Sequence, residues 1–216
     1  MKTARFYAVM LLLVLFASCR KEEDPVPTPI EEPQPTFQLT NTSGSYWIYL
    51  VYTIDSTGAE TQLGYRDSVY VAGDTTINGN SYIHYQGTWL GMQKDFILRD
   101  SAGFIVNNYG AILFNRVGFT DTVHSSNDGT YITHSMTASG LIPITVPALT
   151  VDCYDQQTHF YMANGTPMSV CDSVWIKHTY YNFHTGEELI SQIALANQLQ
   201  AECKYMERRL AVVHIE

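Results

Sequence analysis

Basic side chains are scarce in this sequence, and their scarcity excludes a class of partners. Lysine and arginine number 12 against 21 aspartates and glutamates, which gives a formal net charge of −9 at pH 7. Loss of residues 1–18, argued below, would remove two of the basic residues and leave 10 − 21 = −11. Because nucleic acid and anionic lipid repel a chain of this charge, we expect no nucleic-acid partner and no electrostatic membrane contact.

The sequence also lacks the spacings that catalytic and metal sites use. It contains no G-x-S-x-G, H-E-x-x-H, Gly-rich phosphate loop, EF-hand or C-x-x-C pattern. Its 7 histidines are scattered singly, whereas a metal site needs several ligands that converge. We therefore expect no catalytic residues, no metal site and no cofactor, and an enzyme is the least favoured class.

Long apolar runs are absent as well. The run from Phe6 to Ala17 is too short to cross a bilayer core, but two basic residues precede it, which is the order of a secretory signal. Small residues then stand directly before Cys19. This stretch resembles the lipobox of bacterial lipoproteins, and the resemblance implies that residues 1–18 are removed and Cys19 is lipidated. The alternative is an ordinary signal peptide with a chance cysteine.

Residues 19–36 have the composition of a tether. Five of the 8 prolines lie in this segment, with acidic residues between them, and such chains extend by about 3.1 Å per residue. The cluster Lys21–Asp24 resembles the export tag that sends lipoproteins of Bacteroidota to the cell surface. The resemblance implies a lipid-anchored protein of the outer membrane, exposed at the surface; the alternative is a plain solvated linker.

Residues 37–216 read as a single β domain. Tyr46–Ile54 is aromatic and β-branched on both alternating faces, which predicts a strand covered on both sides. Turn signals recur between apolar runs, and Asn78–Gly79 predicts a type I′ hairpin. About ten strands are expected, which makes the class all-β: one antiparallel curved sheet, a half-barrel or barrel-like. Beside Tyr46–Ile54, strands are expected at Arg66–Val71, Phe96–Asp100, Gly103–Val106, Tyr131–Met136, Leu149–Tyr154, Val174–Phe183 and Arg209–Ile215.

One stretch resists this interpretation. Ile193–Arg209 is rich in helix-forming residues, whereas Glu187–Leu195 can be read as a further strand. We expect a strand, then one short helix or a loop, then a final strand.

Three cysteines follow Cys19, and an exported chain meets an oxidising compartment. Cys153 and Cys171 flank a hairpin-like segment with Asn164–Gly165 near its middle, so a bridge across the hairpin is one prediction. The alternative is that the three cysteines are separate buried thiols.

A triplet of Asp, Ser or Thr, and a small or apolar residue recurs six times where composition predicts roughly 0.8. It resembles the O-glycosylation acceptor of periplasmic proteins of Bacteroidota. The alternative is structural, because Asp and Ser favour turn starts. The acceptor positions would be Ser56, Ser68, Thr75, Ser101, Thr122 and Ser173.

Four segments carry a resemblance to uncharacterised lipoproteins of Bacteroidota. Gly44–Tyr49 matches a G-x-x-W-x-Y opening, Asp74–Gly79 a D-T-x-I-N-G hairpin and Val146–Thr150 a V-P-A-x-T strand, and Glu207–Leu210 closes the pattern. Such proteins are similar to the half-barrels of lipoprotein carriers. The resemblance implies a curved sheet that partly wraps a helix or a ligand.

The chain has 15 Tyr, 9 Phe and 3 Trp, a load that suits a lipid-binding or sugar-binding face but that any β domain also collects. The tryptophans at 47, 89 and 175 are expected to be core anchors. The sequence thus favours a non-catalytic binding module for a hydrophobic or saccharide ligand, attached to the membrane through its lipid. The alternative is a structural or assembly subunit of a cell-envelope complex. The identity of a protein or small-ligand partner stays open.

Overall fold

The structure is a computed structural model that describes residues 39–115, 122–127, 129, 131–170, 173–182, 188–193 and 203–216. All of them belong to the compact unit Pro35–Glu216. Every regular element among the described residues is a strand, which confirms the all-β class. The short helix considered within 193–209 falls largely on residues 194–202, which lie outside the described part.

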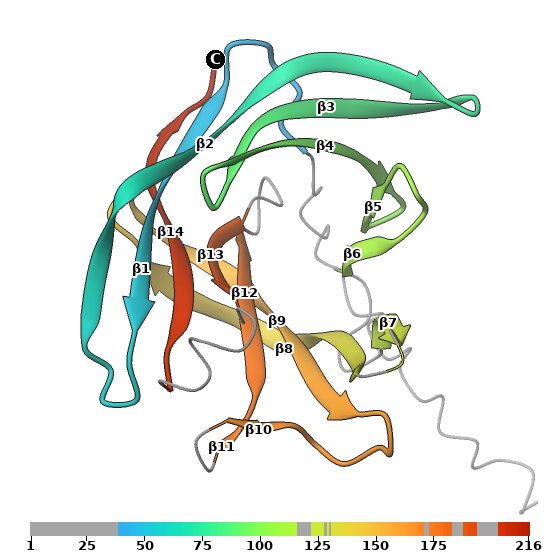
Figure 1. Cartoon of the computed structure of the whole chain (residues 1–216). Coiled ribbons are helices and arrows are strands. Elements are labelled where there is room, and N and C mark those ends of the chain that lie inside the picture. Colours follow the sequence, from blue (N-terminus) through green and yellow to red (C-terminus); the bar gives the residue numbers. More distant parts are fainter. Residues whose placement is uncertain are drawn as a thin grey trace, which may run out of the picture. The chain divides into compact units, whose positions relative to one another are not determined.

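Fourteen strands are present in the described part of the chain (Figure 1). β1 keeps the predicted bounds, whereas most other strands are longer than the apolar runs that predicted them. The strands are β1 (Tyr46–Ile54), β2 (Glu60–Ile77), β3 (Asn80–Trp89), β4 (Met92–Ser101), β5 (Phe104–Asn107), β6 (Ile112–Asn115), β7 (Thr122–Asn127), β8 (Tyr131–Thr145), β9 (Thr150–Met162), β10 (Ser169–Val170), β11 (Ser173–Val174), β12 (Ile176–Asn182), β13 (Glu188–Ile193) and β14 (Tyr205–His214).

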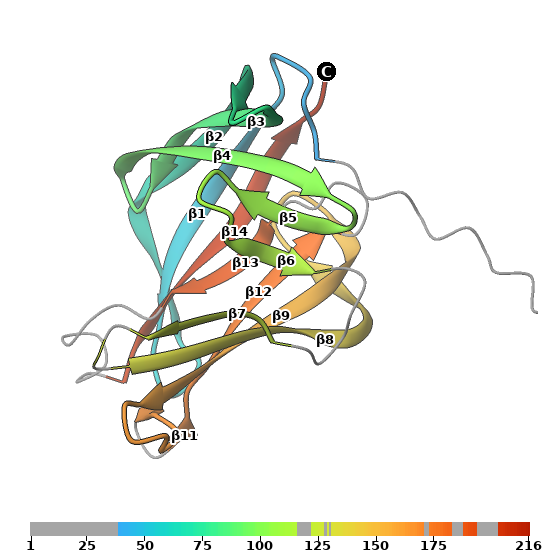
Figure 2. The ribbon, with the colours of Figure 1, turned by 90° about the vertical axis from the view of Figure 1, so that its right-hand side faces the viewer.

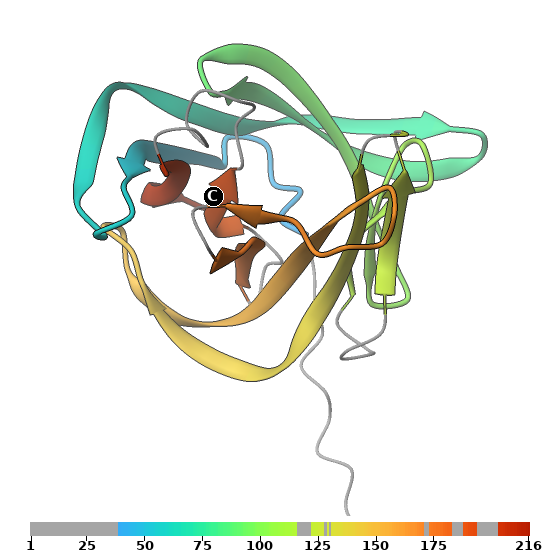
Figure 3. The same ribbon diagram turned by 60° about the horizontal axis from the view of Figure 1, so that its bottom comes forward.

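Twelve of these strands form one antiparallel sheet in the order β6-β5-β4-β3-β2-β1-β14-β13-β12-β9-β8-β7, and β10 and β11 form a small separate pair. The first and last strands of the chain pair in the middle of the large sheet, with Tyr46 opposite His214. The sheet curls until its two edge strands, β6 and β7, approach each other. Figures 2 and 3 show the resulting curved wall around an interior, so the predicted barrel-like sheet is confirmed.

Irregular positions in the long strands produce this curl. The register between β1 and β2 shifts between Leu50 and Tyr52, and that between β2 and β3 shifts between Val71 and Gly73. Such bulges bend a strand and increase its twist. Gly87 in β3 permits a close approach, because a Cβ at this position would lie 1.9 Å from the carbonyl oxygen of Ser68. Any larger residue would push β2 and β3 apart.

The hairpin turns explain the tight strand connections. Asn78 and Gly79 have φ angles of 52° and 78°, as the predicted type I′ turn requires. Leu90 and Gly91 adopt the same pattern, with φ angles of 53° and 75°. A leucine seldom occupies this backbone region, so the structure around Leu90 must hold it there.

Two apolar clusters form the core inside the sheet. One is built on Trp47, Tyr49 and Leu210 in the central strands, and the other joins Leu39 to Phe114 near the sheet edge. The outward face of β1 is only half-buried, and Tyr46 at its start is 38% exposed. The prediction of a strand covered on both sides was therefore wrong for the outward face.

The predicted bridge between Cys153 and Cys171 does not form, because Cys153 is a free thiol that is 0% exposed. Cys153 lies opposite Asn182 in the β9–β12 pairing, and Cys171 lies outside the described residues. Cys203 is disulfide-bonded, so the alternative of three separate buried thiols was wrong as well.

Candidate functional site

A cavity of about 520 Å³ occupies the inside of the curled sheet. Its described lining comes from nearly every strand of the large sheet, because inward-facing residues alternate along each strand and converge on the barrel axis. Leu39 also reaches the cavity and is buried among Ile105, Phe114 and Tyr154. This volume lies within the 300–1,000 Å³ or so that small-molecule sites typically have.

One wall of the cavity is aromatic and comes from β1, β3 and β4. Trp47 and Tyr85 meet edge to face with ring centroids 6.0 Å apart, and Trp89 and Phe96 lie 6.3 Å apart. Tyr49 lies beside Trp47 in the same core cluster. Aromatic residues favour strands, so the sequence pattern predicted that these residues lie in strands. It could not show that their rings line the same wall of a cavity.

The facing wall is polar and comes from β8, β9 and β12. Gln156 is paired with Thr179, Thr158 with Lys177 and Ser135 with Thr158, so the five side chains form one patch on three adjacent strands. In Figure 3 these strands lie across the interior from β2, β3 and β4. The Ser135 and Thr158 hydroxyl oxygens are 3.0 Å apart and share a hydrogen bond.

A buried ion pair fixes the aromatic wall. Arg208 and Asp67 are 2% and 0% exposed, and Arg208 Nε donates to Asp67 Oδ2 at 2.9 Å. The guanidinium carbon lies 4.2 Å from the ring centroid of Tyr49 and 4.0 Å from that of Trp89. The amides of Leu90 and Gly91 donate to the same carboxylate, each at 2.9 Å. Asp67 therefore holds the strained Leu90 turn as well as the cation.

Two uncharged side chains that line the cavity each hold a buried polar atom with no hydrogen-bond partner among the described residues. The Trp47 indole Nε1 is a donor on a side chain that is 2% exposed, and Gln156 Oε1 is an acceptor on one that is 7% exposed. Buried polar groups in native proteins are usually paired, because each unpaired group costs about 1–3 kcal/mol. The residues that line the cavity thus include a donor on one wall and an acceptor on the other with no partner among the described residues.

Charged side chains line the exposed part of the cavity. Lys94 Nζ lies 5.4 Å from the ring centroids of both Trp89 and Phe96. Its neighbour Asp95 is exposed and pairs with His84 at 3.1 Å. Both signs of charge are therefore present beside the aromatic wall.

On β9 and β12 a histidine–carboxylate contact lies apart from the cavity lining. His178 Nδ1 is 2.9 Å from both carboxylate oxygens of Asp155, and Gln157 Nε2 donates to the same carboxylate at 2.9 Å. Burial, reinforced by Asp155, raises the pKa of Tyr180 to about 12. Burial also raises the pKa of the Cys153 thiol to about 12, with Asp152 adding to the effect. The thiol on this strand is therefore protonated at neutral pH and is a poor nucleophile.

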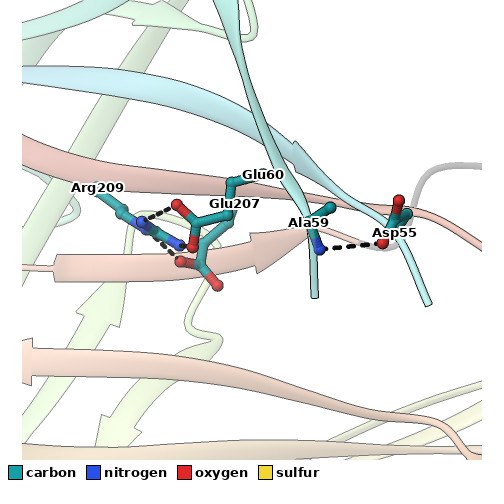
Figure 4. A network of polar contacts seen from close by, with 5 residues as sticks. All are labelled: Asp55, Ala59, Glu60, Glu207 and Arg209. Carbon is teal, nitrogen blue, oxygen red and sulfur yellow. Dashed lines mark hydrogen bonds and ion pairs between the residues drawn. The ribbon is translucent and has the colours of Figure 1, made fainter. Parts of the chain in front are cut away.

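A second charged network lies where β1, β2 and β14 meet (Figure 4). Arg209 Nη1 donates to Glu60 Oε2 at 2.8 Å, and Arg209 Nε donates to Glu207. The hydrogen bond from Arg209 lowers the pKa of Glu60 below its ordinary value. At the nearby β1–β2 turn, Asp55 accepts from the Thr57 hydroxyl and from the amides of Thr57 and Ala59, and these bonds lower the pKa of Asp55.

The predicted glycosylation positions are spread over several strands and turns. Three of the triplet aspartates have structural roles: Asp55 and Asp100 accept turn amides, and Asp67 binds Arg208. Those contacts supply a structural reason for half of the triplets, whereas sugar attachment stays a prediction. Ser56, Ser68 and Thr122 are exposed, Thr75 and Ser101 are half-buried, and Ser173 is in β11 with its side chain outside the described part.

The other predicted sites are only partly described. Cys19 and Cys171 lie outside the described residues, so lipidation stays a prediction. Trp47 is a core anchor as expected; Trp89 and Trp175 are half-buried. Within the described residues no three metal-ligating side chains cluster, and no helix there is long and apolar enough to cross a membrane.

Comparison with known proteins gives a likeness of fold. No protein-family model and no curated protein sequence matches the chain. Among solved structures, it is similar to a putative exported protein with a YmcC-like fold from Bacteroides fragilis. The TM-score is 0.51 at 10% sequence identity, and the match covers 82% of this chain and 99% of that one. At this identity the likeness concerns the fold alone, and it agrees with the resemblance to uncharacterised proteins of Bacteroidota.

Proposed function

We propose that this chain is a non-catalytic binding module that holds a hydrophobic or saccharide ligand inside its curled sheet. The observation that carries the proposal is the cavity of about 520 Å³, with its aromatic wall and its buried, unmatched polar atoms. A barrel whose only task is structural would gain stability by filling this space with side chains, because a cavity lacks the contacts that stabilise a packed core.

The proposal includes a membrane anchor. Its support is the short apolar run before Cys19 and the proline-rich tether that follows it. Several acyl chains on Cys19 would hold the domain firmly at an outer membrane, since one chain alone binds only marginally. The acidic residues of the tether favour exposure at the cell surface.

A specific observation also favours the second candidate, an assembly subunit of a cell-envelope complex. Tyr46, Tyr70 and Val212 are exposed on the paired strands β1, β2 and β14, with exposed fractions of 38%, 46% and 41%. An exposed apolar patch can receive a protein partner. The patch and the cavity are distinct features, so one experiment can separate the two candidates.

That experiment is native mass spectrometry of the protein purified gently from its host. A small non-protein mass that co-purifies is expected, and it should be absent from a Ser135→Phe variant, in which a ring replaces a buried hydroxyl of the cavity wall. A Thr61→Phe variant, altered at an exposed strand residue, should retain it. A protein partner in fixed stoichiometry would favour assembly, and an empty monomer would contradict both.

A further inference from the structure

We infer that the ligand is a saccharide, a compact molecule whose hydroxyl groups face the β8–β9–β12 wall while its ring faces stack on the aromatic wall. This inference deepens the proposed function and rests on it. The aromatic residues alone are compatible with either a hydrophobic or a saccharide ligand, and the inference selects the saccharide.

The first argument is the distribution of polarity inside the cavity. A site for an acyl chain needs apolar side chains all round, because each buried methylene favours an apolar environment by about 0.8 kcal/mol. Here Ser135, Gln156 and Thr179, all at least nine-tenths buried, occupy one continuous wall. An acyl chain would leave the unmatched Gln156 Oε1 on this wall without a hydrogen bond, which is costly for a buried polar atom.

The second argument is the chemistry of the unmatched atoms. Gln156 Oε1 needs a donor and Trp47 Nε1 needs an acceptor. A hydroxyl group can be either, so a molecule with several hydroxyls can satisfy both atoms at once. A fatty acid has a single polar end and cannot supply polar groups to two walls of the same cavity.

The third argument is the aromatic wall itself. Trp47, Tyr85, Trp89 and Phe96 line one side of the cavity; Trp89 and Phe96 are half-buried, whereas Trp47 and Tyr85 are 2% and 5% exposed. The faces of aromatic rings carry negative charge density, which attracts polarised C–H groups as it attracts cations. Sugar rings have such C–H faces on one side and hydroxyls at their edges, which matches one aromatic wall opposite one polar wall.

The test uses the mature chain, residues 19–216, with Cys19→Ala so that no detergent competes for the cavity. The first probe is an array of bacterial and plant di- to tetrasaccharides. The second is sodium laurate, whose binding is measured by calorimetry. We expect binding to at least one oligosaccharide and none to laurate. Gln156→Leu removes the unmatched acceptor at nearly constant volume, and its affinity for that oligosaccharide should fall by about tenfold or more.

The matched control is Gln157→Leu, the same exchange at the next residue of β9, whose amide bonds Asp155 instead of lining the cavity. Its affinity should match that of the parent chain. A second variant, Trp47→Phe, keeps an aromatic ring but removes the indole donor, and it should also bind more weakly. Because Gln156→Leu removes a buried unmatched atom, its urea midpoint should not fall, which separates lost binding from lost folding.

The outcomes distinguish the inference from the proposed function. Laurate binding that Gln156→Leu leaves unchanged or strengthens, with no oligosaccharide bound, would overturn the saccharide inference and leave the binding module standing. Oligosaccharide binding that Gln156→Leu does not weaken would overturn the assignment of the polar wall. Binding of neither probe, together with an empty protein from the host, would overturn the inference and the proposed function.

Discussion

Removal of the Asp67 side chain is the change to which this structure should be most sensitive. In an Asp67→Ala variant the guanidinium of Arg208 would stay between the rings of Tyr49 and Trp89 without the carboxylate now 2.9 Å from its Nε. Loss of one partner from a buried ion pair costs about 3–5 kcal/mol, because the remaining buried charge loses that part of its compensation. The amides of Leu90 and Gly91 would lose their acceptor too, although water can replace it at a turn.

The assay is urea denaturation followed by tryptophan fluorescence, since Trp47 and Trp89 line the affected wall. The melting temperature of a domain of this size falls by roughly 2–4 °C for each kcal/mol of lost stability. For Asp67→Ala the melting temperature should therefore fall by about 6–20 °C, together with the urea midpoint. A Glu60→Gln variant is the control, because it breaks an ion pair in which Glu60 is 44% exposed and should cost no more than about 1 kcal/mol.

A double variant decides whether the charge is the cause. Asp67→Leu combined with Arg208→Met replaces the ion pair by apolar side chains of similar size, and such exchanges are often neutral or stabilising. It should therefore recover most of the stability that Asp67→Ala loses. If Asp67→Ala costs less than about 1 kcal/mol, or if the double variant is the less stable of the two, the reasoning is refuted.

Charges and cysteines give four further predictions. The pKa of Glu60 is lower in the folded chain than its ordinary value of 4.5, so the stability that Glu60 contributes is complete above 4.5 and is lost as the pH falls through the folded pKa. When the urea midpoint is measured at decreasing pH, it should therefore fall less steeply for Glu60→Gln than for the parent chain. Cys153 should not react with a thiol reagent at pH 8 in the folded chain and should react after unfolding, because the pKa of its buried thiol is raised to about 12; reaction before unfolding would contradict the buried position. Cys203 is disulfide-bonded and Cys19 is expected to carry lipid, so non-reducing peptide mapping should find Cys171 joined to Cys203, and Cys19→Ala should release the protein from membranes; a variant that stays on the membrane would rule out the anchor.

The part of the fold that local residues dictate could be predicted from the sequence. Asn78–Gly79 supplied the positive φ angles of its hairpin, and the aromatic and β-branched run at Tyr46–Ile54 fixed the bounds of β1. The turn at Leu90 was missed, because leucine gives no turn signal and the cause of the conformation is Asp67, 23 residues away. Local propensity cannot report a turn that a distant carboxylate holds.

The candidate site was predictable only in outline. The aromatic residues at 47 and 89 were visible as a group, but their common wall depends on strand register. Asp67 and Arg208 are 141 residues apart, and each reads locally as an ordinary charged residue in a strand. Gln156, in the same way, is one polar residue in a mixed strand until the pairing of β8, β9 and β12 places it on a buried wall.

Because β1 pairs with β14, the large sheet cannot close before the ten residues of β14, 205–214, are available. Contacts between residues this far apart in sequence make folding slow, since a long loop must be ordered before they form. A chain released from its N-terminus first would therefore stay incomplete until its C-terminus emerges, with the central edge of β1 open to other strands. If the chain is exported, as proposed, such a delay would keep it unfolded while it crosses the membrane, and pairing of β14 would be the step that closes the sheet around the cavity.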